Sequence, residues 1–289
     1  MKKISVTSAI LLSSTLLFGC SQSDETAKPA SSQENVKQET AAESVSSNPL
    51  EEVTKQYREY AIGEIDAFVT ATEEFTTAIQ NGDLEKAKEL YAPSRVHYER
   101  AEPIAEVFGD LDPKIDAREG DVPENEWGGY HRLEKGLWID NTTKGYEDYA
   151  DQLMKDVQLL RAKVETVEVT PDLLITGAVD LLNEVSTSKV TGEEDRYSHT
   201  DLYDFLANVE GAEKIYQLLK PALDEKDAEL SKLISEQFSI LYSLLDEHKQ
   251  GDGFVSYTEL TKDDVKALSQ AIDALAEPLS QIGIVVEGV

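Results

Sequence analysis

The sequence predicts an all-α domain over residues 49–289, and three observations support this. Apolar side chains recur at steps of three and four residues through most of the range, which is the spacing of one face of a helix. Start and stop signals for helices separate these periodic stretches. No convincing run alternates apolar and polar residues, as a half-buried strand would.

Two long helices open the domain. Residues 51–80 carry the periodic pattern without interruption, and Asn81-Gly82-Asp83 is a turn that ends this helix and caps the next one. The second helix is predicted over residues 84–108. Because proline lacks the N–H that a helix interior needs, Pro93 and Pro103 are expected to bend or restart it.

The middle of the domain is less regular. Residues 109–127 contain prolines and glycines without helical spacing, and a short helix is expected over residues 130–138. Helices over residues 147–167 and 171–190 follow. The second of these opens with Thr170-Pro171, a pair that suits a helix start.

The last third returns to long helices after a polar loop. Thr261 and Asp264 form a capping-type start for the final helix. The predicted elements are the loop 191–198 and the helices 201–219, 221–248 and 261–275.

The amino-terminal segment is expected to lie outside this fold. Lys2 and Lys3 precede a short apolar run that ends at Cys20, which indicates a secretory signal over residues 1–19 and not a membrane span, since spanning needs about 20 apolar residues. Residues 17–20 resemble the bacterial lipobox, where a lipid is attached to the cysteine; an ordinary signal peptide is the alternative. Residues 20–48 are polar and predict a lipidated cysteine with a disordered tether.

The chain is strongly acidic, with 57 acidic and 27 basic residues and a formal charge of −30. This charge excludes nucleic acid as a partner and disfavours electrostatic contact with an anionic membrane surface. It is consistent with a solvated, soluble surface or with a field that gathers cations.

Several acidic residues have a spacing that suits metal binding. Glu99 and Glu102 are three residues apart, so both carboxylates face one side of a helix and repel unless a cation lies between them. A pair of solvated surface acids is the alternative. In the irregular stretch, Asp116 offers another oxygen ligand and Arg118 a clamp for carboxylates.

Two histidines accompany these acids. His131 and Glu134 form an H-x-x-E pair, which presents an imidazole and a carboxylate to the same side of a helix. His199 lies in an acidic loop before a helix, where it is a metal ligand, a cap or a buried hydrogen-bonding group.

Other chemistries lack their motifs. The chain has no H-E-x-x-H, no G-x-S-x-G and no phosphate-binding glycine loop. The segment ending at Glu259 is not an EF-hand loop, because His248 and Gln250 stand where that loop needs Asp or Asn. With four histidines and one cysteine, the candidate site is mostly oxygen, which suits hard cations such as iron(III), manganese or calcium.

Three ordered segments, residues 114–118, 129–138 and 191–202, resemble the EfeO/EfeM family of iron-uptake lipoproteins, which share an imelysin-like domain. The resemblance covers residues 49–289. It implies two four-helix-bundle lobes with a metal cleft between them. The metal ligands that we infer with it are Glu99, Glu102, Asp116, His131, Glu134 and Glu194, and the residues expected around them are Arg118, Tyr130, Tyr197 and His199.

The resemblance also implies a function. Such a protein is anchored through Cys20 on the extracellular face of the cytoplasmic membrane, captures Fe3+ or Fe2+, and delivers it to an EfeU-like permease beside an EfeB-like haem peroxidase. Zinc or another divalent cation is the alternative metal. No enzymatic activity is expected; a metal-dependent peptidase and a metal-dependent polyanion-binding surface protein are the alternative functions.

Overall fold

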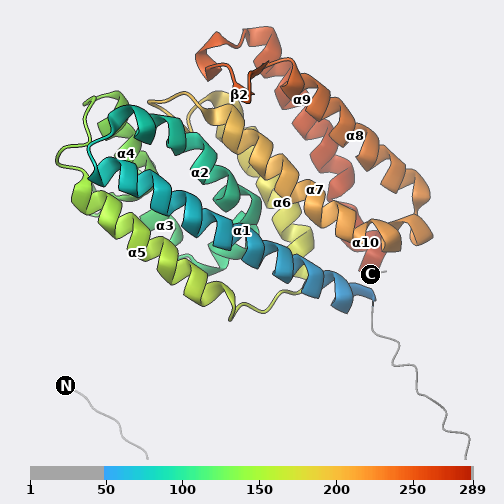
Figure 1. The fold of residues 1–289 in the computed structure, drawn as a ribbon. Coiled ribbons are helices and arrows are strands. Elements are labelled where there is room, and N and C mark those ends of the chain that lie inside the picture. The colour runs from blue at the N-terminus through green and yellow to red at the C-terminus, as the bar shows by residue number, and fades with distance from the viewer. Residues whose placement is uncertain (1–48, 288–289) are drawn as a thin grey trace, which may run out of the picture. The chain divides into compact units, whose positions relative to one another are not determined.

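The computed structural model describes residues 49–287, and the predicted all-α class is confirmed (Figure 1). The predicted signal, Cys20 and the tether lie outside the described residues. The helices are α1 (Pro49–Gln80), α2 (Leu84–Ala105), α3 (Asp112–Ile115), α4 (Gly129–Trp138), α5 (Glu147–Val164), α6 (Pro171–Thr187), α7 (Asp201–Lys226), α8 (Ala228–Asp246), α9 (Lys262–Leu279) and α10 (Ile282–Glu287). Short 3-10 turns cover Glu106–Phe108, Lys189–Thr191 and Tyr257–Glu259.

Side chains at the helix starts satisfy backbone N–H groups that have no partner inside the helix. The Asp83 side chain accepts a hydrogen bond from the N–H of Lys86, and Thr170 accepts one from Leu173. Thr261 and Asp264 form the predicted reciprocal capping box at the start of α9. These starts were therefore readable from the sequence.

The helix restart expected at the prolines was wrong, while a bend there stays a prediction. α2 runs through both Pro93 and Pro103, and α7 runs through Pro221 to Lys226. The buried face of α7 continues on both sides of the proline, through Leu219 and Leu223, so tertiary packing sustains the helix despite the missing N–H.

The chain was expected to break between helices at Lys220, but α7 ends at Lys226 and α8 begins after Asp227. Its side chain accepts a hydrogen bond from the N–H of Leu230 and caps α8. The connection from α8 to α9 contains a short antiparallel hairpin, β1 (Lys249–Gln250) with β2 (Gly253–Phe254). Strands of two residues are too short to show an alternating pattern, so they could not be predicted from the sequence.

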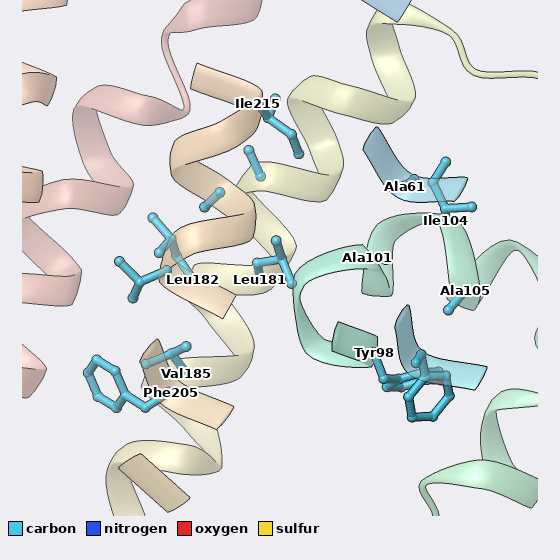
Figure 2. Packing of buried hydrophobic residues seen from close by; sticks show 14 of the residues in the cluster. Ala61, Tyr98, Ala101, Ile104, Ala105, Leu181, Leu182, Val185, Phe205 and Ile215 are labelled. Carbon is cyan, nitrogen blue, oxygen red and sulfur yellow. The ribbon is translucent and has the colours of Figure 1, made fainter. Parts of the chain in front are cut away.

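Helix packing produces two overlapping sets. α1 packs against α2 and α5, while α6 packs against α7 and α9, and α8 against α7 and α9. α2 joins the sets because it also packs against α7 and α6. Buried apolar side chains of α2, α6 and α7 meet at this junction (Figure 2), and one continuous apolar core runs through both sets. The division into two lobes therefore stays a prediction.

Two glycines bring α2 close to its neighbours. A Cβ at Gly177 of α6 would lie 2.6 Å from Pro103 Cβ, and one at Gly211 of α7 would lie 2.8 Å from the Arg100 carbonyl oxygen. Polar side chains of α2 contact α7 and the segment that precedes it: Arg95 lies against Asp204 and Glu194, and Glu99 accepts from Asn208. Among residues 49–287, no helix combines the length and the apolar character that crossing a bilayer requires.

Candidate metal centre

Charged side chains collect inside the protein where α2, α4 and α7 meet the segment 189–201. Charges are rarely buried unless they are paired or bind metal. The buried charged or titratable residues of this region are Arg95, Glu99, Glu102, His131, Glu134, Lys189, Glu194, Asp195, Asp201 and Asp204. Acids outnumber bases among them, so the region favours an added cation.

His131 lies at the centre, on the first turn of α4, and is 1% exposed. Its Nδ1 is 3.2 Å from the Tyr91 hydroxyl and 3.2 Å from Glu134 Oε2. Its Nε2 has no hydrogen-bond partner among the described residues, but lies 3.7 Å from both Asp116 Oδ1 and Glu194 Oε1. We call Asp116, His131 and Glu194 the Nε2 cluster.

The Nε2 cluster has the dimensions of a metal site. Two ligand atoms that each lie about 2.1 Å from a tetrahedral metal are about 3.4 Å apart. The observed separations of 3.7 Å are too long for hydrogen bonds, yet need only a small contraction to bind one ion. A metal-bound histidine usually donates its other N–H to an oxygen, and Nδ1 has that kind of partner here.

Glu134 is held on the Nδ1 side of the imidazole. Its Oε1 accepts hydrogen bonds from the backbone N–H of Tyr197 (2.9 Å) and of Ser198 (2.8 Å), and from the Ser198 hydroxyl (2.9 Å). With His131 and Asp195 it forms a second possible ligand group, the Nδ1 cluster. The H-x-x-E spacing does place both side chains together, but in this structure Glu134 orients His131.

The pKa values of this pair follow from these contacts. Burial would raise the pKa of Glu134, but the hydrogen bonds from His131 and from the backbone N–H groups hold it below its usual range. Burial and the nearby Arg95 would lower the pKa of His131, but the carboxylates of Glu134, Glu194 and Asp116 raise it to about 10. Without metal, His131 therefore carries a proton that a metal ion must displace.

Arg95, which the sequence analysis missed, lies among the carboxylates. Its Nε donates to Asp204 Oδ2 at 3.0 Å, its Nη2 to Glu99 Oε1 at 2.8 Å, and its Nη1 to Asp116. Glu99, Glu194 and Asp204 around it form a third possible ligand group, the arginine cluster. The i, i+4 spacing of Arg95 and Glu99 was the available sequence signal, but such pairs are usually on the surface.

Lys189 is a second internal cation that the sequence analysis missed. It is fully buried, and its Nζ lies 2.9 Å from Glu99 Oε2 and 2.9 Å from Glu184 Oε1. Glu194 Oε1 is 3.9 Å away. Lys189 therefore links α2, α6 and the acidic segment before α7, and it compensates part of their negative charge.

Glu99 and Glu102 do share one face of α2, but they are buried and not solvated. The amide Nδ2 of Asn208 donates to Glu99 Oε2 (3.1 Å) and to Glu102 Oε2 (2.9 Å). Glu99 belongs to the arginine cluster, whereas Glu102 belongs to none of the three groups. A direct metal role for these two residues stays a prediction.

The four residues expected around the ligands lie at different distances from them. Arg118 Nη1 donates to Glu194 Oε2 at 2.9 Å, and the ring of Tyr130 packs 5.7 Å from the Arg95 guanidinium carbon. Tyr197 contributes its backbone N–H to Glu134. His199 has a positive φ of 59° and lies outside all three groups.

Burial disfavours the charged form of several carboxyl groups here. Burial raises the pKa of Glu99 to about 8 and that of Asp201 to about 7, and it raises the pKa of Glu102 and Asp204 well above the usual range. By contrast, Lys189, His131 and Arg95 overcome the burial of Glu194 and hold its pKa well below the usual range. The buried bases therefore favour the charged form of Glu194, the carboxylate of this set that faces Nε2 of His131.

The Nε2 cluster adjoins a polar pocket of about 290 Å³. Asp116, Arg118 and Glu194 line it, and exposed residues such as Glu106 and Asp121 lie at its edge, so the pocket connects the cluster with solvent. Acidic side chains dominate this lining. A cation in the pocket can therefore reach Asp116 and Glu194, the two carboxylates that face Nε2 of His131.

Comparison with protein families matches residues 53–282 to imelysin. A protein of Staphylococcus haemolyticus described as an Efem/EfeO family lipoprotein is 50% identical over 295 residues, covering 99% of this chain and all of the relative. One of the same description from Staphylococcus aureus is 50% identical over 247 residues, covering 82% of this chain and 86% of the relative. The chain therefore belongs to the imelysin family, in the branch of the Efem/EfeO family lipoproteins.

Proposed function

We propose that this protein captures iron outside the cytoplasm with the Nε2 cluster and delivers it to a membrane permease, without enzymatic activity. The observation that carries the proposal is the buried Nε2 of His131, which has no hydrogen-bond partner among residues 49–287 and faces two carboxylate oxygens at 3.7 Å. A buried polar atom without a partner indicates a missing ligand, ion or water.

The ligand chemistry supports a hard or borderline cation. One imidazole nitrogen and two carboxylate oxygens suit iron in either oxidation state, and they also suit zinc or manganese. Iron is favoured over these because the relatives are described as Efem/EfeO family lipoproteins, and the resemblance of this sequence to that family implies iron uptake. The metal is cargo in this proposal and must leave again.

Internal cations help the cluster to exist without metal. Arg95 donates to Asp116, and Arg118 donates to Glu194, so both carboxylates keep a partner when the ion departs. This lowers the free energy of the empty site, because buried carboxylates without partners are costly. The free energy of iron binding is then modest, so that the iron can be released again on delivery.

The description of the relatives as lipoproteins supports anchoring, and Cys20 is the residue we propose for it. The lipid would hold the domain at the extracellular face of the cytoplasmic membrane. An EfeU-like permease would receive the iron, and an EfeB-like haem peroxidase is the proposed companion. The acidic surface gathers cations near the pocket.

The test is a calorimetric titration of residues 21–289 with iron(II) without oxygen, iron(III) citrate, zinc, manganese and calcium. We expect tight iron binding that is abolished in His131→Ala. His97→Ala is the matched control, because His97 also pairs with a glutamate, Glu64, at 2.8 Å, but lies outside the three possible ligand groups. Unchanged iron binding in His131→Ala would contradict the assignment. Preference for zinc with chelator-sensitive peptide cleavage would favour the peptidase, and calcium-dependent retention of anionic glycan would favour the polyanion-binding function.

A further inference from the structure

Tyr91 of α2 connects the metal centre to a row of aromatic side chains. Its hydroxyl donates a 2.8 Å hydrogen bond to Asp195 Oδ1 and lies 3.2 Å from Nδ1 of His131. The side chain is fully buried. A tyrosine in contact with both a metal-binding imidazole and a carboxylate can give up an electron while the carboxylate takes its proton.

The row continues from Tyr91 toward the surface. The rings of Tyr91 and Trp138 meet edge to face, with their centroids 5.3 Å apart. Trp138 ends α4, is half-buried and has the ammonium group of Lys88 at 5.8 Å from its ring. The next residue, Ile139, is 58% exposed. An electron therefore has a path of two adjacent rings between His131 and the outside.

The pocket and the aromatic row lie on different sides of the imidazole. The pocket adjoins Asp116 and Glu194, which face Nε2, whereas Tyr91 contacts Nδ1. A small oxidant that enters through the pocket would reach the metal from one side, while the electron donor lies on the other. Because the Tyr91 hydroxyl lies between His131 and Asp195, the ring that contacts Trp138 is also in direct contact with the metal centre.

We propose that Tyr91 and Trp138 form an electron relay that supplies the second electron when bound iron(II) meets hydrogen peroxide. The inference rests on the proposed iron binding at the Nε2 cluster. Its consequence is that the peroxide is reduced to water without release of hydroxyl radical. An exported iron carrier would thereby be protected from its own cargo.

The electrons and protons of this reaction balance. Reduction of one peroxide to two waters breaks the O–O bond and consumes two electrons and two protons. One electron comes from iron(II), which becomes iron(III), and one from Tyr91, whose phenolic proton passes to Asp195; solvent supplies the two protons. Trp138 then returns an electron to the Tyr91 radical, Asp195 returns the proton, and the indole N–H proton leaves to solvent.

The experiment uses the mature protein loaded without oxygen with one equivalent of iron(II), mixed with one equivalent of hydrogen peroxide. Electron paramagnetic resonance of rapidly frozen samples detects tyrosyl and tryptophanyl radicals, and a spin trap detects hydroxyl radical. Wild type is expected to form protein radicals and few trap adducts. Tyr91→Phe is expected to lose the protein radical and to gain adducts, and Trp138→Phe to prolong the tyrosyl signal.

Tyr98→Phe is the matched control. Tyr98 lies on the same helix and its ring contacts that of Phe68, but its hydroxyl donates to Asp112 at 2.6 Å. It is expected to behave as wild type. Equal radical and adduct yields in Tyr91→Phe and wild type, both shown by calorimetry to hold iron(II), would overturn the relay alone. Failure of wild type to bind iron(II) would overturn both the relay and the proposed function.

Discussion

Replacing Lys189 with methionine removes a buried positive charge while keeping a side chain of similar length. The Nζ atom that disappears lies 2.9 Å from Glu99 Oε2 and 2.9 Å from Glu184 Oε1. Breaking a buried ion pair from one side costs about 3–5 kcal/mol. We expect the lower end, about 3 kcal/mol, because burial raises the pKa of Glu99 to about 8, so this partner is already partly neutral when Lys189 is present.

Thermal unfolding of the metal-free protein measures this effect. A loss of about 3 kcal/mol corresponds to a decrease in Tm of about 6–12 °C for a domain of this size. Iron or zinc should raise the Tm of the variant more than that of wild type, because the ion supplies the missing positive charge near Glu194.

The matched control is Lys232→Met, which removes an exposed pair with Glu236 at 3.4 Å and should change the free energy of unfolding by no more than about 0.5 kcal/mol. A Lys189→Met protein within about 1 kcal/mol of wild type would refute the reasoning.

Three further predictions concern the backbone and the protons of the site. Gly129→Ala should destabilise the protein by more than about 1 kcal/mol, because φ is +73° and the new Cβ would lie 2.3 Å from the Ile115 carbonyl oxygen. Gly63→Ala, on an open helix surface, should stabilise the protein by about 1 kcal/mol. Denaturant unfolding that ranks the two variants in the opposite order would contradict this. Metal binding near neutral pH should release about one proton from His131, whose pKa the nearby carboxylates raise to about 10. The heat of binding measured by calorimetry should therefore vary with the ionisation enthalpy of the buffer. The same heat in all buffers would contradict this. Glu99→Gln should flatten the pH dependence of the stability of the metal-free protein. Because burial raises the pKa of Glu99 to about 8, folded wild type keeps a proton on Glu99 between pH 4.5 and 8 that the unfolded chain loses, so its stability falls as pH rises through that window, by up to about 1.4 kcal/mol per pH unit. Equal slopes for the two proteins would contradict this prediction.

The helical fold could be predicted because its signals are local. Apolar periodicity marked the long helices, and the Thr261 box marked the start of α9. Proline also acts locally, but no new helix begins at Pro103 or Pro221, where packing against distant helices sustains the helix. No local signal reports such contacts.

The site was predictable only in part for a related reason. The resemblance identified His131 and Glu194 because both lie in recognisable segments. Arg95 and Lys189 escaped notice, since a single basic residue in an amphipathic sequence normally faces water. Arg95 binds Asp204, which is 109 positions away in the sequence, and only the close packing of α2 on α7 brings them together.

The central claim is that His131 Nε2, Asp116 and Glu194 hold one iron ion, and the position of that ion tests it most directly. Crystals of the iron-loaded protein, measured at the iron absorption edge, would locate the metal by anomalous scattering. The account predicts one peak at about 2.1 Å from His131 Nε2 and within bonding distance of both carboxylates. A peak on the Nδ1 side, between Glu134 and Asp195, or one among the carboxylates around Arg95, would contradict it.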